Sequence, residues 1–318
     1  MAFGRTWLAS AAAIAVAGIG VAPALAVVVD GNTSTYSTYN TNAPSGIAGF
    51  NNVGTVNGST GVYLGNGWVI TASHVGSATF QLPAYSGSTT YSVIGGSAVQ
   101  LKNADNSNVD LTMFKINNAP ALPTLTIGSS APSVGTSLYL VGNGYNRKDL
   151  SGTSDKVYYS VTGSGSSTTW TQLPNSVGAN ASGYQLDTSA QAVRYGQAST
   201  VDADSTTSGN QSTYTINDGY GTQPVFTTVF QDLTGNANAV SHDSGGGIFD
   251  SSNALRGIII AMATYQNQPS DTAIFGDQTD AVDLSAYRSQ INAIMVPEPA
   301  MLGILGLLGV FGLRRRRA

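Results

Sequence analysis

The heptapeptide SHDSGGG, residues 241–247, places a serine directly before three glycines. Glycines let the backbone turn tightly around a hydroxyl, so that N–H groups can converge where an oxyanion would form. The motif is therefore typical of a nucleophilic serine, Ser244. Glycine-rich turns are common in this chain of 38 glycines, however, so the interpretation depends on finding a base for that serine elsewhere.

The choice of base is narrow because the chain contains only two histidines. His242 stands two residues from Ser244 on the same turn, which is a poor geometry for proton transfer between the two side chains. His74 follows the apolar stretch WVITAS at 68–73. We therefore predict that His74 is the general base; the alternative is a buried structural histidine.

A third motif lies between these two. Asp110 directly precedes the apolar stretch LTMFKI at 111–116, and the order along the chain is thus His, Asp, Ser. This order and the sequence around each residue resemble the trypsin-like serine proteases of the chymotrypsin fold. The resemblance implies a serine endopeptidase in which Ser244 attacks a peptide carbonyl, His74 moves the proton and Asp110 orients His74. A turn or strand-end cap is the alternative role for Asp110, and Asp105, in a predicted loop, is its local competitor.

The resemblance also implies the fold. We expect an all-β protein of two antiparallel six-stranded β-barrels, closed by a C-terminal helix packed on the second barrel. No metal and no organic cofactor are implied.

The resemblance places the oxyanion hole on the backbone N–H groups of His242 and Ser244. The family usually has glycine where His242 stands, and losing one such donor costs about 10²–10³ in rate. Asp243 in the family often receives an N-terminal ammonium created by activation cleavage. Residues 27–31 (VVVDG) are only weakly similar to such a new N-terminus, and two possibilities stay open: the amino group of Val27 pairs with Asp243, or it does not.

The sequence gives the weakest indication for the residues of the specificity pocket. The family's pocket floor lies six residues before the nucleophile, at Asn238, and a neutral amide would not favour Arg or Lys as a carboxylate would. The family's substrate-pairing strand aligns with Gly257–Met262, and it usually has small residues where Ile260 and Met262 fall. These two larger side chains predict a narrow or reshaped pocket.

Composition limits the functional class. The chain has 318 residues, of which 42% are hydrophobic, 9% are charged and none is cysteine. Disulfides and thiol catalysis are therefore excluded. Removing Arg5 and the four terminal arginines from the thirteen bases, and Glu298 from the seventeen acids, leaves eight bases against sixteen acids. A domain this acidic repels phosphates, so we predict no nucleic-acid partner.

Four segments are predicted along the chain. Residues 1–26 indicate a secretory signal, with Arg5, an apolar run and the cleavage site ALA at 24–26; the alternative is an uncleaved anchor. Residues 27–49 are predicted to be an irregular lead-in. Residues 50–295 form the protease domain, with the passage between barrels near 117–135 and an insertion between Asp110 and Ser244.

Short apolar runs separated by turn residues predict the strands. In the first half we expect strands at 61–64, 68–71, 78–82, 91–94, 98–101 and 111–116, with a tight hairpin turn at Asn66-Gly67. Strands are also expected at 136–142, 225–231, 247–249 and 255–263. Leu284, Tyr287, Ile291 and Ile294 lie on one face of a helix that Asp283 would cap.

The last segment, 296–318, joins Pro-Glu-Pro to an apolar run at 300–313 and an Arg-rich end. It resembles the PEP-CTERM sorting signal of Gram-negative bacteria. The resemblance implies recognition by an exosortase-type enzyme, transient membrane association through 300–313, and delivery to the cell surface or extracellular matrix. A plain tail anchor is the alternative, although the run is shorter than the roughly 20 apolar residues that span a bilayer.

Two other functions compete with a secreted peptidase that cuts protein or peptide substrates. One is a catalytically silent protease fold serving as an adhesion or matrix module. The other is a structural β-rich surface protein in which the three motifs occur by chance.

Overall fold

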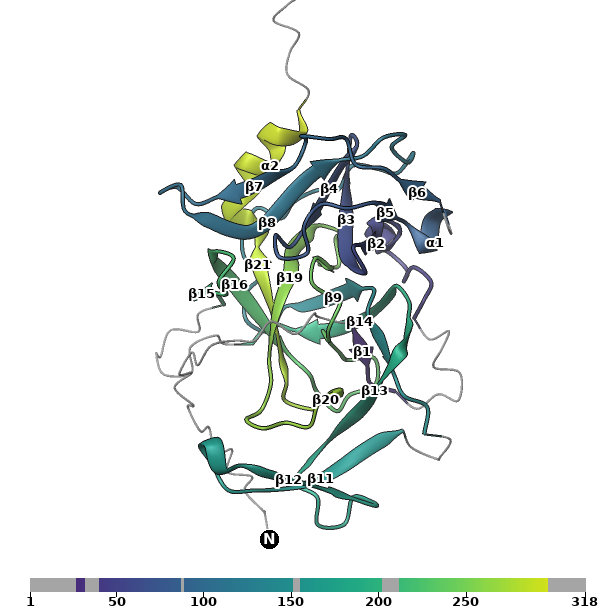
Figure 1. Cartoon of the computed structure of the whole chain (residues 1–318), viewed down its shortest axis with the longest axis vertical. Helices are drawn as coiled ribbons and strands as arrows, with labels where there is room; N and C mark the ends of the chain where they lie inside the picture. The colour runs from purple at the N-terminus through teal and green to yellow at the C-terminus, as the bar shows by residue number, and fades with distance from the viewer. Residues whose placement is uncertain (1–26, 32–39, 87–88, 151–154, 202–211, 297–318) are drawn as a thin grey trace, which may run out of the picture.

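The computed structural model describes residues 27–31, 40–86, 89–150, 155–201 and 212–296. Its regular structure is mostly antiparallel strands, with a short C-terminal helix, and so confirms the expected all-β fold of the chymotrypsin-like type (Figure 1). Each of the two large sheets has seven strands, where six were expected, and its hydrogen-bonded path is open and not closed into a ring. The segments at 1–26 and 297–318, to which the signal and sorting predictions refer, lie outside the described residues.

The first large sheet comes from the first half of the chain, in the strand order β6-β5-β2-β3-β4-β8-β7. Its strands are β2 (Val53–Val56), β3 (Ser59–Gly65), β4 (Trp68–Thr71), β5 (Phe80–Gln81), β6 (Thr90–Tyr91), β7 (Val99–Lys102) and β8 (Asn108–Lys115). The predicted hairpin turn joins β3 to β4, with φ values of 53° at Asn66 and 82° at Gly67. Strand β8 begins before Asp110, so this aspartate lies inside the strand and not ahead of it.

The second large sheet has the order β14-β9-β18-β19-β21-β16-β15. Its strands are β9 (Ser137–Gly142), β14 (Arg194–Ser199), β15 (Tyr214–Asn217), β16 (Thr222–Val229), β18 (Gly247–Phe249), β19 (Leu255–Ala263) and β21 (Gln278–Asp283). The short strand β18, which begins at the last glycine of the SHDSGGG motif, pairs with both β9 and β19. Ser244 therefore lies in the turn that leads into a central strand.

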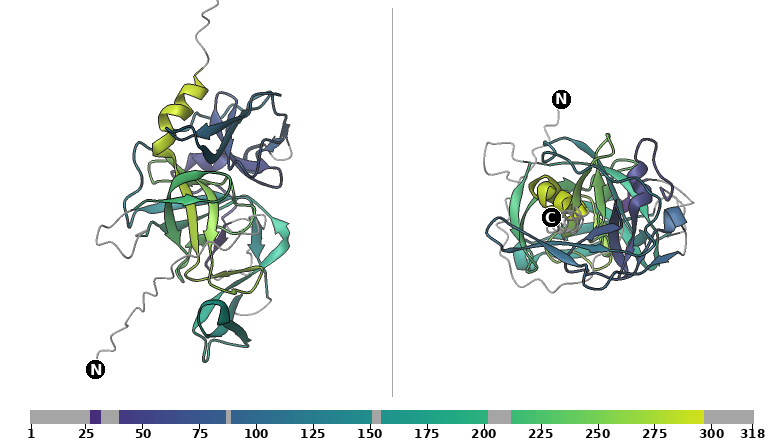
Figure 2. Two further views of the ribbon diagram at one scale, coloured as in Figure 1. Left: turned by 60° about the vertical axis from the view of Figure 1, so that its left-hand side comes forward. Right: turned by 90° about the horizontal axis from the view of Figure 1, so that it is seen from above.

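The insertion between Asp110 and Ser244 forms much of a third sheet. This sheet contains β10 (Tyr145–Arg147), β11 (Lys156–Thr162), β12 (Thr169–Leu173), β13 (Ala181–Gln191) and β20 (Thr272–Ile274), with the 3-10 helix η3 (Gly165–Ser167) between β11 and β12. The β11–β12 hairpin projects from the end of the molecule opposite the C-terminal helix (Figures 1 and 2). Strand β13 is long enough to pair with β10, β11 and β20, and this pairing joins the hairpin to the body of the protein.

The expected irregular lead-in contains regular structure at its start and end. Strand β1 (Val28–Val29) pairs with β17 (Ala237–Asn238), and Val27, Val28 and Val29 are completely buried. The 3-10 helix η2 (Ala48–Asn52) precedes β2, and the single-turn helix α1 (Pro83–Ser86) follows β5. Burial of three successive valines explains why the chain is ordered here, since apolar burial is the main favourable term in folding.

The C-terminal helix forms in two parts, η4 (Leu284–Tyr287) and α2 (Arg288–Met295). Asp283 caps it as predicted, because its side chain accepts from the N–H of Ser285 at 2.9 Å. The helix contacts the second sheet, as expected, through η4 and β19, and it also contacts the first sheet. The helix lies beside β7 of the first sheet (Figure 1), where the hydroxyl of Tyr287 bonds to Asn103 and the backbone N–H of Lys102 bonds to Gln290. The buried face of the helix joins a core cluster to which both large sheets contribute.

The main hydrophobic core crosses the boundary between the two large sheets. One cluster of buried side chains includes Val62 and Phe114 from the first sheet together with Phe249 and Leu255 from the second. Close packing of this kind resists small displacements, so it fixes the two sheets relative to each other. Among the described residues, no helix has the length and apolar character needed to cross a membrane.

Candidate active site

His74 and Asp110 form a hydrogen-bonded pair at the inner end of the first sheet. Nδ1 of His74 lies 2.7 Å from Oδ2 of Asp110, and the backbone N–H of His74 donates to Oδ1 at 3.0 Å. The Asp110 side chain is fully buried, whereas the imidazole keeps 15% of its surface exposed. The carboxylate of Asp110 therefore holds both the backbone and the ring of His74. The second ring nitrogen, Nε2, takes no part in this pairing.

The surroundings of Asp110 come partly from the second half of the chain. Its backbone N–H donates to the side chain of Gln223 at 3.1 Å, and a side chain at Gly221 would come within 2.5 Å of the same nitrogen. Burial raises the pKa of Asp110 to about 6, against the opposing effect of its bonds from His74. The ring of Tyr220 lies 5.2 Å from the His74 ring. The segment 220–223 thus covers the pair, a role that no sequence motif indicates.

The Ser244 turn is held by backbone bonds on both sides. Gly245 donates to the carbonyl of Ile259 at 2.8 Å, and Ile259 donates back to Gly246 at 2.9 Å. Gly245 has a φ of +88°, and a Cβ there would lie 1.9 Å from the carbonyl oxygen of Thr60. Only glycine fits this position, since both the backbone conformation and the space exclude a side chain. The motif is therefore a tight turn, as the sequence predicts.

Thr60 of β3 ties this turn to the first sheet. Its backbone N–H donates to the carbonyl of Ser244 at 3.1 Å, and its hydroxyl donates to the carbonyl of His242 at 2.7 Å. Thr71, three residues before His74, donates in turn to the carbonyl of Thr60 at 2.7 Å. A short chain of hydrogen bonds therefore connects the segment that ends in His74 with the Ser244 turn.

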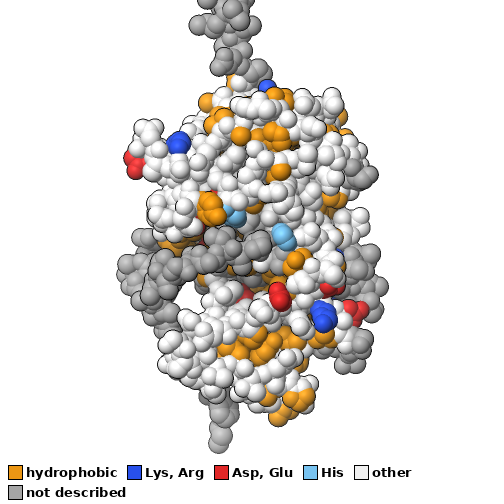
Figure 3. Space-filling view, in the orientation of Figure 1, with side chains coloured by type: hydrophobic (Ala, Val, Ile, Leu, Met, Phe, Trp, Pro, Cys, Tyr) orange, Lys and Arg blue, Asp and Glu red, His pale blue; other side chains and the backbone are white. Residues whose placement is uncertain are grey.

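Ser244 has a buried and uncommitted hydroxyl. Its residue is 1% exposed, and within the described chain its Oγ makes no hydrogen bond, so none joins it to His74 in this structure. Both histidine side chains reach the surface on one face of the molecule (Figure 3). The structure thus brings His74 and Asp110 into direct contact and places Ser244 on a turn anchored to the same sheet.

His242 adopts the left-handed conformation, with a φ of +72°. This value accounts for the family's use of glycine here, because few other residues accept that conformation without strain. The ring of His242 packs edge-on against Tyr145 at 5.3 Å, and burial lowers its pKa. Across the described segments, the backbone N–H groups of His242 and Ser244 have no acceptor, whereas those of Gly245 and Gly246 are both bonded.

Asp243 is a completely buried carboxylate. Burial raises its pKa well above the ordinary value, while the backbone N–H groups of Val240 and Val27 lower it. The bond from Val240 to Oδ2 is 2.8 Å long, and Oδ1 makes no hydrogen bond to any described residue. The first residue of the expected mature chain is thus in contact with Asp243.

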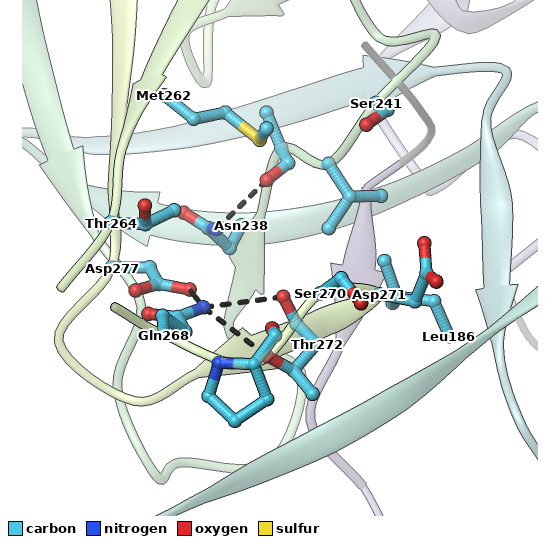
Figure 4. A pocket seen from close by; sticks show the side chains of 13 residues that line it. Leu186, Asn238, Ser241, Met262, Thr264, Gln268, Ser270, Asp271, Thr272 and Asp277 are labelled. Carbon is cyan, nitrogen blue, oxygen red and sulfur yellow. Dashed lines mark hydrogen bonds between the residues drawn. The ribbon is translucent and has the colours of Figure 1, made fainter. Parts of the chain in front are cut away.

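The predicted pocket residues separate into two groups. Asn238 and Met262 line a cavity beside the Ser244 turn (Figure 4), whereas Ile260 is buried in the main core. Asp277 lines the same cavity and was not found from the sequence, where nothing in the neighbouring residues marks it. No group of three or more His, Asp or Glu side chains suited to a metal ion occurs in the described ranges.

The chain was compared with curated proteins, solved structures and family models. A search of the curated proteins found no match. Among solved structures, the chain is similar to an inactive form of Rv3671c from M. tuberculosis H37Rv carrying a serine-to-alanine mutation. That match has 15% identity and a TM-score of 0.43, and covers 86% of this chain and 98% of the other. The active form of the Rv3671c protease matches with 14% identity and a TM-score of 0.40, over 76% of this chain and 75% of that one.

The family model describes a trypsin-like peptidase domain and matches residues 59–258, which include all three motifs and most of both large sheets. This match covers more than half of the chain. The protein belongs to the trypsin-like peptidase family.

Proposed function

We propose that this trypsin-like peptidase is an exported serine endopeptidase with His74, Asp110 and Ser244 as its catalytic residues. The observation that carries the proposal is the His74–Asp110 pair, in which a buried carboxylate bonds to Nδ1 at 2.7 Å. Such a bond orients the imidazole and leaves Nε2 to accept a proton from the nucleophile. Ser244, with an uncommitted hydroxyl on a glycine turn, is the matching nucleophile.

The chemistry follows from these three groups. As Oγ of Ser244 attacks a peptide carbonyl carbon, Nε2 of His74 takes the hydroxyl proton, and Asp110 stabilises the imidazolium that forms. The proton then passes to the leaving amine, and the C–N bond breaks to give an acyl-enzyme. A water molecule, activated by the same imidazole, hydrolyses the ester and frees Ser244.

The oxyanion would be bound by the backbone N–H groups of His242 and Ser244. Both groups lack acceptors within the described chain, which leaves them available for a substrate oxygen. The φ of +72° at His242 gives that peptide the orientation for which the family usually relies on glycine. We therefore expect the histidine to preserve the donor.

Export processing would affect the same site. Cleavage after Ala26 would convert Val27 into an N-terminal ammonium next to the buried carboxylate of Asp243. A positive charge there would offset the cost of burying that carboxylate and hold the Ser244 turn. At the other end, the Pro-Glu-Pro segment, apolar run and terminal arginines support sorting and tail removal by an exosortase-type enzyme, which would release the peptidase at the cell surface.

The test is fluorophosphonate labelling of the chain expressed in full in an exporting Gram-negative host. Intact mass measurement of the recovered protein would read the probe adduct and both termini. We expect one adduct on a chain that starts at Val27 and lacks the terminal arginines, with no adduct in the Ser244→Ala and His74→Ala variants.

A well-folded wild-type protein that takes up no probe would contradict the proposal. That result would favour the catalytically silent adhesion or matrix module. An unprocessed N-terminus together with a normal adduct would instead reject only the proposed link between export and the Asp243 site.

A further inference from the structure

The turn between β15 and β16, residues 218–221, reaches from the second sheet to the first. Strand β16 contacts β8, the strand that carries Asp110 (Figure 1). At Gly221 an added Cβ would lie 2.5 Å from the backbone nitrogen of Asp110 and 2.7 Å from the carbonyl oxygen of Asn108. These contacts leave no room for a side chain at 221, so the backbone of the turn lies directly against the backbone of Asp110.

Side chains from a neighbouring strand hold this turn on the first sheet. Nε2 of Gln100, in β7, donates to the backbone carbonyls of Val109 at 3.0 Å and Tyr220 at 3.4 Å. Nδ2 of Asn103, directly after β7, donates to the carbonyl of Thr222 at 2.6 Å. With these two donors on it, the turn has a fixed place beside Asp110.

Asp218 links the turn to Asp110 through the side chain of Gln223. Oδ1 of Asp218 accepts from the backbone N–H groups of Tyr220 and Gly221, each at 2.9 Å, and its Oδ2 accepts from Nε2 of Gln223 at 2.8 Å. Gln223 is completely buried, and its Oε1 accepts from the backbone N–H of Asp110 at 3.1 Å. An amide has a donor end and an acceptor end, so the bond to Asp218 decides that the oxygen of Gln223 faces Asp110.

The ring of Tyr220 lies against the ring of His74. The two centroids are 5.2 Å apart and the ring planes are inclined by 44°. The bond from Asp110 holds the imidazole at Nδ1 alone, and a single hydrogen bond lets a ring tilt about it. A second ring packed beside the imidazole limits that tilt. Tyr220 is 39% exposed, so its ring serves this contact and not the packing of the core.

We propose that Tyr220 and Gln223 are positioning residues for the His74–Asp110 pair, and that Asp218 holds both of them in place. Gln223 fixes the backbone of Asp110, and Tyr220 limits the tilt of the His74 ring. The inference rests on the proposed peptidase function and adds positioning residues to it. Because β15 and β16 belong to the second sheet, which also contains the strand after the Ser244 turn, these residues set the imidazole relative to the nucleophile.

Two substitutions test this arrangement and should leave the fold intact. Tyr220→Ala removes a partly exposed ring. In Asp218→Asn the amide oxygen can still accept from Tyr220 and Gly221, which keeps the turn, but the amide nitrogen faces Nε2 of Gln223, which breaks that bond. Asp105→Asn is the matched control, since Asp105 also accepts from the N–H two residues further on at 2.9 Å and lies on an exposed loop.

The first test reads the tautomer of His74 and needs no catalysis. The chain has two histidines, so ¹⁵N-histidine labelling gives few ring signals, and the His74→Ala variant identifies those of His74. At pH 8, Nδ1 of His74 should carry the proton in wild type, because Asp110 accepts there. Tyr220→Ala and Asp218→Asn should each move the His74 signals towards a mixture of both tautomers and leave His242 unchanged. Unchanged His74 signals in both variants would overturn the proposal.

The second test measures kcat and KM on a peptide that wild type cleaves. Tyr220→Ala and Asp218→Asn should each lower kcat by about 10- to 100-fold with KM unchanged, because the imidazole is misplaced while substrate binding is not altered. Tyr220→Phe should restore kcat, since it keeps the ring and the Tyr220 hydroxyl makes no hydrogen bond to a described residue. Asp105→Asn should keep the wild-type kcat. A loss that Tyr220→Phe does not restore, or one confined to KM, would contradict the proposed role.

The two tests separate this inference from the proposed function. A protein that takes up no fluorophosphonate and cleaves no peptide, but whose His74 signals change in Tyr220→Ala and Asp218→Asn, would reject the peptidase function and keep the positioning role. Probe uptake and cleavage that neither substitution affects would keep the function and reject the positioning role.

Discussion

Two buried aspartates, Asp110 and Asp277, differ in what they bond to. Asp110, in the first sheet, gives one oxygen to the ring of His74 and the other to the backbone of the same residue. Asp277, beside the second sheet, accepts two bonds on Oδ2, and no residue in the described ranges bonds to its Oδ1. Burial raises the pKa of both groups, to about 6 and about 7.

The difference teaches that burial alone does not assign a role to a carboxylate. A group whose oxygens are both used can orient a neighbour, whereas a buried oxygen that no donor reaches raises the free energy of the folded state. On this basis Asp110 should affect the rate of peptide hydrolysis, and Asp277 should affect stability. The two effects can be measured separately.

The largest expected effect is the loss of kcat when Asp110 is replaced. Replacing Asp110 with Asn should lower kcat by about 10⁴-fold, because the imidazole loses the carboxylate that fixes its tautomer. Steady-state kinetics on a set of peptides that wild type cleaves would measure this, with Asp105→Asn as the charge-matched control. If replacing Asp110 with Asn changed the substrate preference and left kcat unchanged, Asp110 would act in substrate selection and not in orienting His74.

A smaller effect is expected from pH. Burial and the nearby charge of Asp218 raise the pKa of Asp110 to about 6, against the opposing effect of its bonds from His74, and protonated Asp110 is a weaker acceptor for the imidazole. Asp218→Asn removes that charge, so kcat/KM at pH 5.5, relative to its plateau at pH 8, should be about twofold higher than in wild type. His74, in the catalytic role proposed for it, would contribute to this acid limb in every variant, so its position is compared between variants. Asp277→Asn should leave the limb in place, because Asp277 bonds to Ile274 and Gln268 and not to the pair. A limb that moves in Asp277→Asn and stays in Asp218→Asn would contradict the roles assigned to the two buried aspartates.

The smallest effect is on stability. Because the folded-state pKa of Asp277 lies above its unfolded value of 3.8, the folded state holds the proton more tightly, and wild type loses stability as pH rises from about 4 to above 7. Asp277→Asn removes this loss. Its Tm should exceed that of wild type at pH 8 by on the order of 2–5 °C, with a smaller difference at pH 5. Thermal unfolding at both pH values would show it, and a lower Tm for the variant at pH 8 would mean that Oδ1 is stabilised in the free protein.

Sequence patterns identified the features that depend on a few neighbouring residues. The hairpin turn at Asn66-Gly67, strand β4 and the Asp283 cap were predicted because each is specified by local backbone chemistry. The glycine turn around Ser244 was predicted for the same reason. The proximity of His74 and Asp110 followed from a resemblance between motifs, and the structure brings these two residues into contact.

Long-range packing decided what the sequence patterns could not. Ile260 was predicted to line the pocket, yet it is buried in the core, because β19 has an irregular register against β21 between Ile259 and Ala261. A shift of one residue moves a side chain to the other face of a sheet. The C-terminal helix was expected on the second sheet and contacts the first as well, since its apolar face shows only that it packs and not on which partners.

The sequence by itself determined the family of this protein, its all-β architecture and three motifs, since strand periodicity and a glycine turn are written in adjacent residues. Only the tertiary structure revealed the cover that Tyr220 and Gln223 form over the His74–Asp110 pair, and the buried Asp277, whose Oδ1 has no hydrogen-bond partner among the described residues. The physical reason is that a buried carboxylate acquires its role from partners that the fold brings together, and these partners lie far apart in the chain.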